Sequence, residues 1–377
     1  MKKLFKYPLL VLFAVFIVGF TILDCVTPTR THSEFESNLS QMPKFSLQTL
    51  WNGKFTADYE SYVNDQFLLR DEWITLKSYT ETLFGKVENN GVIYGKDGYL
   101  FEKLTSYDEK RLNLNIEAVQ KFCEKYPDLS VKFALIPNSY EVLSDKLPIA
   151  SPVLDQTALI NDIYSKVSSA ENIDILSALK AHNSEYIYYK TDHHWTTLGA
   201  YYAYEKLCDV LDVQKVDIST LNENTVEDFY GTYFSKAKSF TIKPDIIKYY
   251  DVNASMAIMT TDQTGKFVPE TSFATLYDEG KFHTRDKYSA FTHSNNALTV
   301  ITNNGEYEKE RLLVIKDSYS NSLVPFLSTD YKEIVMVDLR YMFNISMVLN
   351  QYDFDDVLIM YNVSTFTGDV DVVKLKY

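Results

Sequence analysis

The stretch Arg311-Leu-Leu-Val-Ile-Lys-Asp-Ser-Tyr-Ser-Asn321 decides the fold class of this chain. It begins as an apolar run and turns polar at Lys316, so Ser318 follows directly on a strand-like segment. Residues 333–337 and 356–360 are apolar runs of the same kind. Strands that are apolar throughout are typical of parallel sheets whose two faces are covered by helices. We therefore expect an α/β fold.

The chain upstream of these runs alternates between strand-like and helical patterns. Asp97-Gly98 is a turn signal between two short strands of a hairpin. Beyond it we expect a helix over 108–125, a strand over 131–136, a helix over 155–170, a strand over 186–189 and a helix over 196–211. Such alternation is typical of α/β proteins. The stretch 215–290 has no clear period, so we predict an irregular insertion there, before a strand over 298–302.

A second polar stretch, Lys190-Thr-Asp-His-His-Trp-Thr196, lies between a predicted strand and a predicted helix. Because open α/β sheets place their binding sites at the carboxyl ends of strands, we expect this stretch to meet Ser318. A serine hydroxyl becomes a good nucleophile when a neutral imidazole accepts its proton and a carboxylate orients that imidazole. We predict Ser318 as the nucleophile, His194 as the base and Asp192 as the orienting acid.

Two other interpretations of these residues stay open. Asp317 and Ser318 also suit the start of a helix, where short polar side chains cap N–H groups. Asp-His-His offers ligands for Mn²⁺ or Zn²⁺ as well. A dinuclear metal site needs further clusters, however, and the remaining histidines lack such neighbours: His32, His182, His283 and His293. We predict neither a metal nor another cofactor.

Asp192-His193-His194-Trp195 is the signature of the DHHW proteins, and the chain resembles this family from about residue 55 to its C-terminus. The segments that carry the resemblance, in chain order, are 64–67 with 70–71, 91–100, 137–139, 229–233 and 316–319. DHHW proteins are similar to the periplasmic alginate O-acetylation proteins, whose SGNH-hydrolase-like domain carries Asp-x-His before the serine. The resemblance implies an SGNH-hydrolase-like domain of flavodoxin-like, three-layer architecture with a circularly permuted order of motifs.

The resemblance also implies roles for individual residues. It matches Ser318, His194 and Asp192 to the family's nucleophile, base and orienting acid. Two candidates for the oxyanion donor are Asn362, after the strand 356–360, and Asn295, where the family tends to carry Gly-Gly-Asn but this chain has His-Ser-Asn-Asn. The implied pocket-lining residues are His193, Trp195, Tyr319 and Arg340. Packing in the core is an equally good interpretation of Trp195 and Tyr319.

The expected function is transfer of an acyl group, most simply acetyl, to a cell-surface polysaccharide or exopolysaccharide through an ester on Ser318. The resemblance implies a membrane-bound O-acyltransferase as the acyl donor. Two alternatives stay open: a carbohydrate esterase with the same triad, and a non-catalytic glycan-binding or assembly protein. The net charge of −14 argues against a nucleic-acid partner, because phosphate binding needs a basic face.

The N-terminal segment predicts the location of the protein. Residues 7–23 carry no charge and follow three lysines at positions 2, 3 and 6, which favour a cytoplasmic start. As a helix this run covers about 25 Å, which we interpret as just enough for a membrane crossing. We predict a cytoplasmic N-terminus over 1–6, a single transmembrane signal-anchor over 7–23, a linker over 24–55 and an extracytoplasmic catalytic domain over 56–377, held at the cell membrane.

Overall fold

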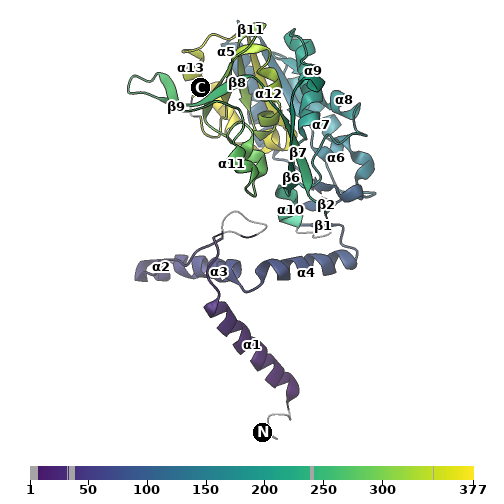
Figure 1. Cartoon of the computed structure of the whole chain (residues 1–377), viewed down its shortest axis with the longest axis vertical. Coiled ribbons are helices and arrows are strands. Elements are labelled where there is room, and N and C mark those ends of the chain that lie inside the picture. Colours follow the sequence, from purple (N-terminus) through teal and green to yellow (C-terminus); the bar gives the residue numbers. More distant parts are fainter. Residues whose placement is uncertain (1–6, 32, 34–38, 238–241, 343) are drawn as a thin grey trace. The chain divides into compact units, whose positions relative to one another are not determined.

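The structure is a computed structural model of the chain, and it describes residues 7–31, 33, 39–237, 242–342 and 344–377 (Figure 1). The chain divides into two compact units. The N-terminal unit comprises residues 1–89 and 235–241, and the α/β unit comprises residues 90–234 and 242–377.

The N-terminal unit is mainly helical. Its elements are α1 (Pro8–Val26), α2 (Leu47–Trp51), α3 (Lys54–Gln66), α4 (Arg70–Leu83) and the short β1 (Glu88–Asn89). Ion pairs hold the turn between α3 and α4, because the Arg70 guanidinium lies 3.3 Å from the Asp65 carboxylate and 3.4 Å from that of Asp71.

The predicted membrane anchor is contradicted. Within the described part of the chain, no helix combines the length and the apolar character that a membrane crossing requires. Length is a physical reason, since the uncharged run 7–23 covers about 25 Å whereas the hydrocarbon core of a bilayer is about 30 Å thick. Asp24 then places a charge in the last turn of α1. The predicted localisation as a single-pass membrane protein is therefore wrong, and the predicted cytoplasmic segment 1–6 lies outside the described residues.

An eight-stranded sheet forms the centre of the α/β unit (Figure 1). Its strands, in spatial order, are β5 (Glu171–Ile173), β4 (Val131–Ile136), β13 (Asp356–Asn362), β11 (Lys309–Lys316), β12 (Tyr331–Val337), β10 (Leu298–Asn303), β8 (Ala254–Thr261) and β9 (Phe267–Phe273). The five strands from β5 to β12 run parallel, and β10, β8 and β9 are each antiparallel to the preceding strand. Every residue of β4 and β13 is buried, so both faces of the parallel part are covered.

Helices supply that cover. The Phe133 ring of β4 contacts Tyr164 of α7 (Gln156–Lys166) and Phe366 of α14 (Val363–Gly368), and α14 in turn packs on α5 (Glu109–Lys125). A second group joins α9 (Thr197–Leu211) to α12 (Val324–Leu327) through Phe326, whose ring meets two tyrosines of α9. The predicted α/β class is confirmed as a mixed α/β fold with a large central sheet.

The remaining elements of the α/β unit are short. Two hairpins stand beside the main sheet: β2 (Val92–Tyr94) with β3 (Leu100–Glu102), and β6 (Glu223–Phe229) with β7 (Asp245–Tyr250). The helices are α6 (Ser139–Val142), α8 (Ile175–Lys180), α11 (Glu279–Phe282) and α13 (Ser346–Leu349), and α10 (Thr232–Ala237) contains residues assigned to both units. The 3-10 turns are η2 (Lys96–Gly98), η3 (Ser144–Lys146), η4 (Ile218–Thr220), η5 (Lys287–Ala290), η6 (Ser318–Ser322) and η7 (Val372–Lys376).

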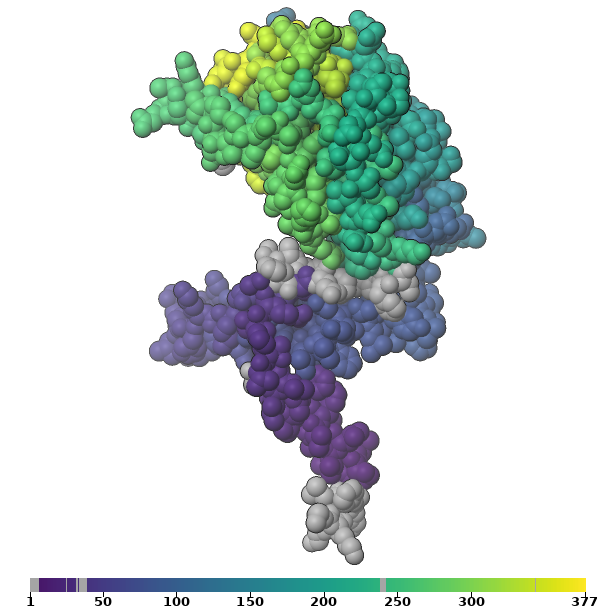
Figure 2. Space-filling model, viewed as in Figure 1, coloured from purple at the N-terminus to yellow at the C-terminus, as the bar shows by residue number. Residues whose placement is uncertain are grey.

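Two sequence-based expectations about elements are wrong. Residues 186–189 form no strand; Tyr188 makes only an isolated bridge to Trp195, because the chain folds back on itself there instead of joining the sheet. The stretch 215–290 is not irregular, because it contains β6, β7, β8 and β9. Solvent-facing polar residues break its apolar pattern, and the β8–β9 hairpin protrudes from the α/β unit in Figures 1 and 2.

Candidate active site

The loop that carries His194 is closed by local contacts. Its base is the bridge between Tyr188 and Trp195, and α9 begins directly after it with Thr196 as N-cap, whose Oγ1 accepts a hydrogen bond from the Gly199 N–H at 3.2 Å. A Cβ on Gly199 would lie 2.2 Å from the Ile187 carbonyl oxygen, so only glycine lets α9 start this close to the loop. The contacts at the base of the loop are therefore between residues close together in sequence.

A buried carboxylate holds the first half of this loop from behind. Asp245 of β7 accepts hydrogen bonds from the backbone N–H groups of Lys190 and Thr191, at 2.9 and 2.7 Å, and from the Thr191 hydroxyl at 2.5 Å. Burial raises the pKa of Asp245, and these donors oppose the rise. No sequence signal marked this residue, because it lies in the stretch that we expected to be irregular.

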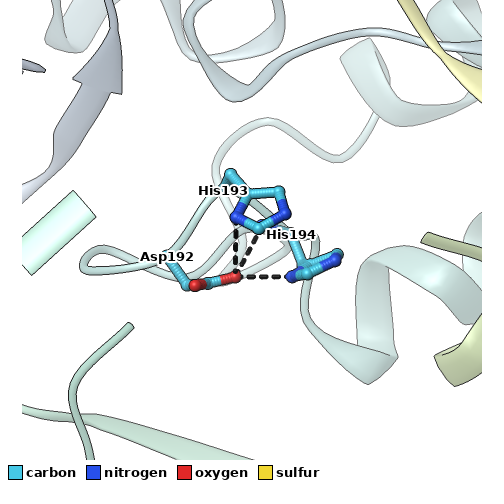
Figure 3. A group of neighbouring side chains, drawn as sticks. All are labelled: Asp192, His193 and His194. Carbon is cyan, nitrogen blue, oxygen red and sulfur yellow. Dashed lines mark hydrogen bonds and ion pairs between the residues drawn. The ribbon is translucent and has the colours of Figure 1, made fainter. Parts of the chain in front are cut away.

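Asp192 is buried and uses both of its carboxylate oxygens. Oδ1 accepts the backbone N–H of His194 at 3.0 Å and lies 2.6 Å from His194 Nδ1 (Figure 3). Oδ2 accepts the backbone N–H and the hydroxyl of Thr232, at 2.8 and 3.1 Å. Burial alone would raise the pKa of Asp192, but the two neighbouring imidazoles hold it well below its usual range. The group is therefore a carboxylate at neutral pH.

Gly231 makes this approach of Thr232 to Asp192 possible. A Cβ at position 231 would lie 2.2 Å from Asp192 Cβ and 2.3 Å from Asp192 Oδ2. The segment 229–233, which carries part of the family resemblance, thus supplies the outer support of the carboxylate. The similarity of this segment to the family was therefore a signal for Thr232, a residue for which we predicted no role.

Ser318 opens η6, directly after β11. Its Oγ lies 2.8 Å from His194 Nε2, although 124 positions separate the two residues in sequence. Asp317 fixes the turn by accepting the N–H groups of Tyr319 at 3.0 Å and Asn362 at 2.8 Å, which ties the ends of β11 and β13 together. The structure thus brings the predicted serine, histidine and aspartate into one hydrogen-bonded row.

The His194 imidazole is set up to accept a proton. Burial, with the positive charge that the adjacent His193 can carry, lowers the pKa of His194 to about 4, so the ring is neutral at neutral pH. A neutral ring that donates from Nδ1 to Asp192 presents the lone pair of Nε2 to Ser318. This is the protonation state that a general base requires.

The adjacent His193 forms a hydrogen bond with Thr232. Its Nδ1 lies 2.7 Å from the Thr232 hydroxyl, and about a third of its side chain is exposed. The same Nδ1 lies 3.5 Å from Asp192 Oδ1 (Figure 3). Although burial opposes it, the Asp192 carboxylate raises the pKa of His193. The ring centroids of His193 and His194 lie 3.8 Å apart, which disfavours a charge on both rings at once.

Two aromatic residues tie the His194 loop to the Ser318 turn. The Trp195 indole is fully buried and donates from Nε1 to the Tyr319 carbonyl and the Ser322 hydroxyl, each at 3.0 Å. Tyr319 is also buried, and its hydroxyl donates to the His193 carbonyl. Both side chains therefore pack between the two segments.

The two asparagine candidates are placed differently. Asn362 is buried and its amide is used as a cap, because Nδ2 donates to the Ile136 carbonyl at 3.0 Å and Oδ1 accepts the Ser364 N–H at 2.9 Å. Asn295 lies beside the serine turn, where its Oδ1 accepts from Lys316 Nζ at 2.8 Å and from Asn321 Nδ2 at 3.2 Å. With its oxygen fixed in this way, the Asn295 amide group turns its Nδ2 away from those partners.

Arg340 follows β12 at the same edge of the sheet. It makes a bidentate ion pair with Asp338, with Nε 2.9 Å from Oδ1 and Nη2 2.5 Å from Oδ2, and about a third of its side chain is exposed. Its charge is therefore largely neutralised by its own neighbour.

Asp192, His193 and His194 also form a group whose possible ligand atoms lie within 4.8 Å of one another. Hydrogen bonds already occupy these atoms, however: four donors reach the Asp192 carboxylate, and His193 Nδ1 is paired with Thr232. A metal ion would have to replace that network. The arrangement favours proton transfer over metal ligation.

The chain has a mixed α/β fold in which Ser318, His194 and Asp192 are joined by hydrogen bonds near the carboxyl ends of the parallel strands. The profile of the DHHW protein family matches residues 129–337, more than half of the chain. The chain belongs to the DHHW family.

Solved structures share the fold. The crystal structure of a DHHW family protein from Eubacterium siraeum has a TM-score of 0.66 and 26% identity, and the match covers 77% of this chain and 96% of that one. Bacillus cereus PatB1, solved with a sulfonyl adduct, has a TM-score of 0.61 and 21% identity, with 76% and 98% covered. The second likeness speaks to the fold alone.

Among curated proteins, the chain is similar to the probable alginate O-acetylase AlgJ of Pseudomonas aeruginosa. The two are 23% identical over 197 residues, which is 49% of this chain and 50% of AlgJ. The match thus spans about half the length of that relative.

Proposed function

We propose that this chain is a serine-dependent O-acyltransferase that moves acetyl groups to a polysaccharide. The observation that carries the proposal is the His194 imidazole, which lies 2.8 Å from Ser318 Oγ and 2.6 Å from Asp192. The likeness to a probable alginate O-acetylase supports acetyl as the acyl group and a polysaccharide as the acceptor. A membrane-bound O-acyltransferase as donor is part of the same proposal.

The first half-reaction loads the serine. Ser318 Oγ attacks the carbonyl carbon of the acetyl donor while its proton moves to His194 Nε2, and Asp192 stabilises the resulting imidazolium. When the tetrahedral intermediate collapses, the bond to the leaving group breaks and His194 returns the proton to that group. The product is an acetyl ester on Ser318.

The second half-reaction unloads it. A sugar hydroxyl gives its proton to His194 Nε2 as its oxygen attacks the acetyl carbonyl, and collapse restores the Ser318 hydroxyl with the same proton. Water in place of the sugar would make the chain an esterase. The two activities share every residue of the row and differ in the acceptor.

Charge on the carbonyl oxygen needs a donor, and we assign that role to Asn295. Its Oδ1 accepts hydrogen bonds from Lys316 and Asn321, residues on either side of Ser318, and these contacts leave the N–H groups of Nδ2 uncommitted. Asn362 serves as the cap of α14 and supports the turn from below. One such donor contributes roughly 3–4 kcal/mol to the transition state.

We further propose that the domain is an SGNH-hydrolase-like, three-layer domain with a permuted order of motifs. Asp192 and His194 precede Ser318 in the chain, whereas in ordinary SGNH hydrolases the serine comes first. The wound parallel strands, with the site at their carboxyl edge, support this assignment.

The test uses the full chain with p-nitrophenyl acetate, a sulfonyl fluoride and an oligosaccharide acceptor. We expect a burst of p-nitrophenolate, a single sulfonyl adduct on Ser318 by peptide mass spectrometry, and loss of both in Ser318→Ala. Ser320→Ala, two residues along the same turn, is the matched control and should keep both. Absence of any Ser318-dependent reaction would overturn the enzyme and favour a glycan-binding role.

The acceptor separates the two enzymatic alternatives. Acetyl groups found on the oligosaccharide, in amounts that fall with Ser318→Ala, support the transferase. Release of free acetate alone, with every acceptor tried, would make the chain an esterase.

A further inference from the structure

Tyr288 contacts both His194, through its ring, and the Ser318 backbone, through its hydroxyl. It lies in η5, within the stretch 215–290, and is buried. Its ring stacks on the His194 imidazole, with centroids 3.7 Å apart and planes inclined by 11°. Its hydroxyl donates to the Ser318 carbonyl at 3.2 Å and lies 3.1 Å from the Ser322 hydroxyl.

These contacts link three separate segments. Ser322 also accepts a hydrogen bond from Trp195 Nε1 at 3.0 Å, so the histidine loop, the serine turn and η5 meet at one hydroxyl. Burial raises the pKa of Tyr288 further above its normal range, so its hydroxyl keeps the proton that it donates. The ring itself is fixed by Phe291, with centroids 5.2 Å apart, and by Tyr189 at 6.4 Å.

The imidazole needs such a support. The torsion that turns a histidine ring about its Cβ–Cγ bond is broad, so one hydrogen bond from Nδ1 to Asp192 does not by itself fix the plane. A turn of the ring would carry Nε2 out of line with Ser318 Oγ. A flat ring stacked at 3.7 Å opposes this rotation and also keeps water from one face of the imidazole.

We propose that Tyr288 is a positioning residue for the acyl transfer: its ring fixes the plane of His194, and its hydroxyl holds the Ser318 backbone at the distance that the proton transfer needs. This inference rests on the proposed roles of His194 and Ser318 and adds a third segment to the site. It also gives η5 a role in the site, in addition to the support that Thr232 and Asp245 of the same stretch provide to the histidine loop.

Other charges near the ring must be kept constant in a test. The titratable groups that act on or contact His194 or Tyr288 include Asp192, His193, Lys316, Asp317, Tyr189 and Tyr319. None is altered by a substitution at position 288. A change in the His194 pKa would therefore report on the stack and on access of water.

The primary experiment is NMR of the full chain with ¹⁵N-labelled histidine, titrated from pH 3.5 to 8. In Tyr288→Ala we expect the His194 pKa to rise by about one unit or more toward the usual value for histidine, because water reaches the open face. Tyr277→Ala is the matched control. Tyr277 is buried in the same cluster and its hydroxyl donates to the Tyr250 carbonyl, away from the triad. Equal His194 titrations in Tyr288→Ala and Tyr277→Ala would overturn the proposal.

Tyr288→Phe separates the ring from the hydroxyl and is mild enough to keep the fold if the alanine variant does not. We expect it to leave the His194 pKa unchanged and to slow sulfonylation of Ser318 about two- to tenfold, the effect of one hydrogen bond. An unchanged rate would overturn the role of the hydroxyl. For Tyr288→Ala we expect a fall in kcat of about 100-fold with little change in KM, because the ring and the serine lose alignment.

Failure of this inference can be told apart from failure of the proposed function. The NMR titration needs no turnover, so it tests Tyr288 even if no acyl transfer is found. Conversely, Ser318-dependent activity that does not change on substitution of Tyr288 would support the proposed enzyme and overturn the positioning role.

Discussion

Two buried carboxylates lie at opposite ends of the same parallel strands. Asp356, the first residue of β13, accepts from Lys132 Nζ at 2.6 Å, Lys309 Nζ at 2.8 Å and the Tyr331 hydroxyl at 2.8 Å. Asp192 lies near the carboxyl ends, paired with the His194 imidazole. Asp356 accepts three hydrogen bonds and Asp192 accepts four, so each buried carboxylate is well compensated.

The difference lies in the partner. Burial would raise the pKa of Asp356, but its lysine and tyrosine donors hold it below its usual range, so this carboxylate stays an anion paired with groups that donate to it. At the other end the partner is a neutral ring whose second nitrogen faces a hydroxyl. A buried carboxylate therefore does not by itself define a reactive site; a partner that can gain and lose a proton does.

Removing the His194 imidazole, the partner of Asp192, should have the largest effect on activity. His194→Ala should lower the rate of acyl-serine formation by a factor on the order of 10⁴ or more, because the residues of such a triad, proposed here, depend on one another. Burst kinetics with p-nitrophenyl acetate measure this, with His193→Ala as the control. A larger loss in His193→Ala than in His194→Ala would assign the base to the neighbouring ring.

Removing the Asp356 carboxylate at the other end of the strands should lower stability rather than activity. Asp356→Ala leaves Lys132 buried without its anion, which we expect to cost about 3–5 kcal/mol of unfolding free energy. Urea denaturation checks the value, and the kcat of the protein that remains folded should be unchanged. Unaltered stability would show that the two ends are less different than their contacts suggest.

The two asparagines sharpen the comparison within the reactive end. Asn295→Ala should lower kcat by about 10²–10³-fold with little loss of stability, because it removes a donor to the oxyanion. Asn362→Ala should chiefly reduce stability, by about 1 kcal/mol, through loss of a helix cap. A loss of kcat in Asn362→Ala with a loss of stability in Asn295→Ala would assign the oxyanion donor to Asn362 instead.

The pH dependence tests whether His194 is the group that changes. With its pKa lowered to about 4, the base is neutral above that pH, so kcat/KM should be flat down to about pH 5 and fall about tenfold per unit below pH 4. Sulfonylation rates on protein that remains folded, verified by circular dichroism, measure this limb. A fall in rate centred near pH 6.5 would show instead that the His194 imidazole is exposed to water.

The smallest effect should come from the outer support of the carboxylate. Thr232→Val removes the hydroxyl that reaches Asp192 Oδ2 at 3.1 Å but keeps the backbone N–H bond at 2.8 Å. We expect a loss of activity of about two- to tenfold. Thr225→Val, on an exposed part of β6, is the control and should behave as wild type.

Particular residues mark how far prediction from the sequence could go. The apolar runs 131–136, 311–315, 333–337 and 356–360 became strands because a strand buried on both faces has no need of alternation. The strands of 215–290 were missed because their exposed polar side chains hide the apolar ones. Tyr288 had no local signal at all, since its role depends on a ring that is 94 positions away in the chain.

The sequence by itself determined the α/β class, the family, and which serine, histidine and aspartate would be worth testing, because chemical identity and local pattern are properties of the chain. Tertiary structure alone decided that His194 Nε2 lies within hydrogen-bonding distance of Ser318 Oγ, that Asn362 rather than Asn295 caps a helix, and that the Tyr288 ring stacks on His194. Those outcomes depend on distances between segments, and such distances are set only when the sheet and its loops pack together.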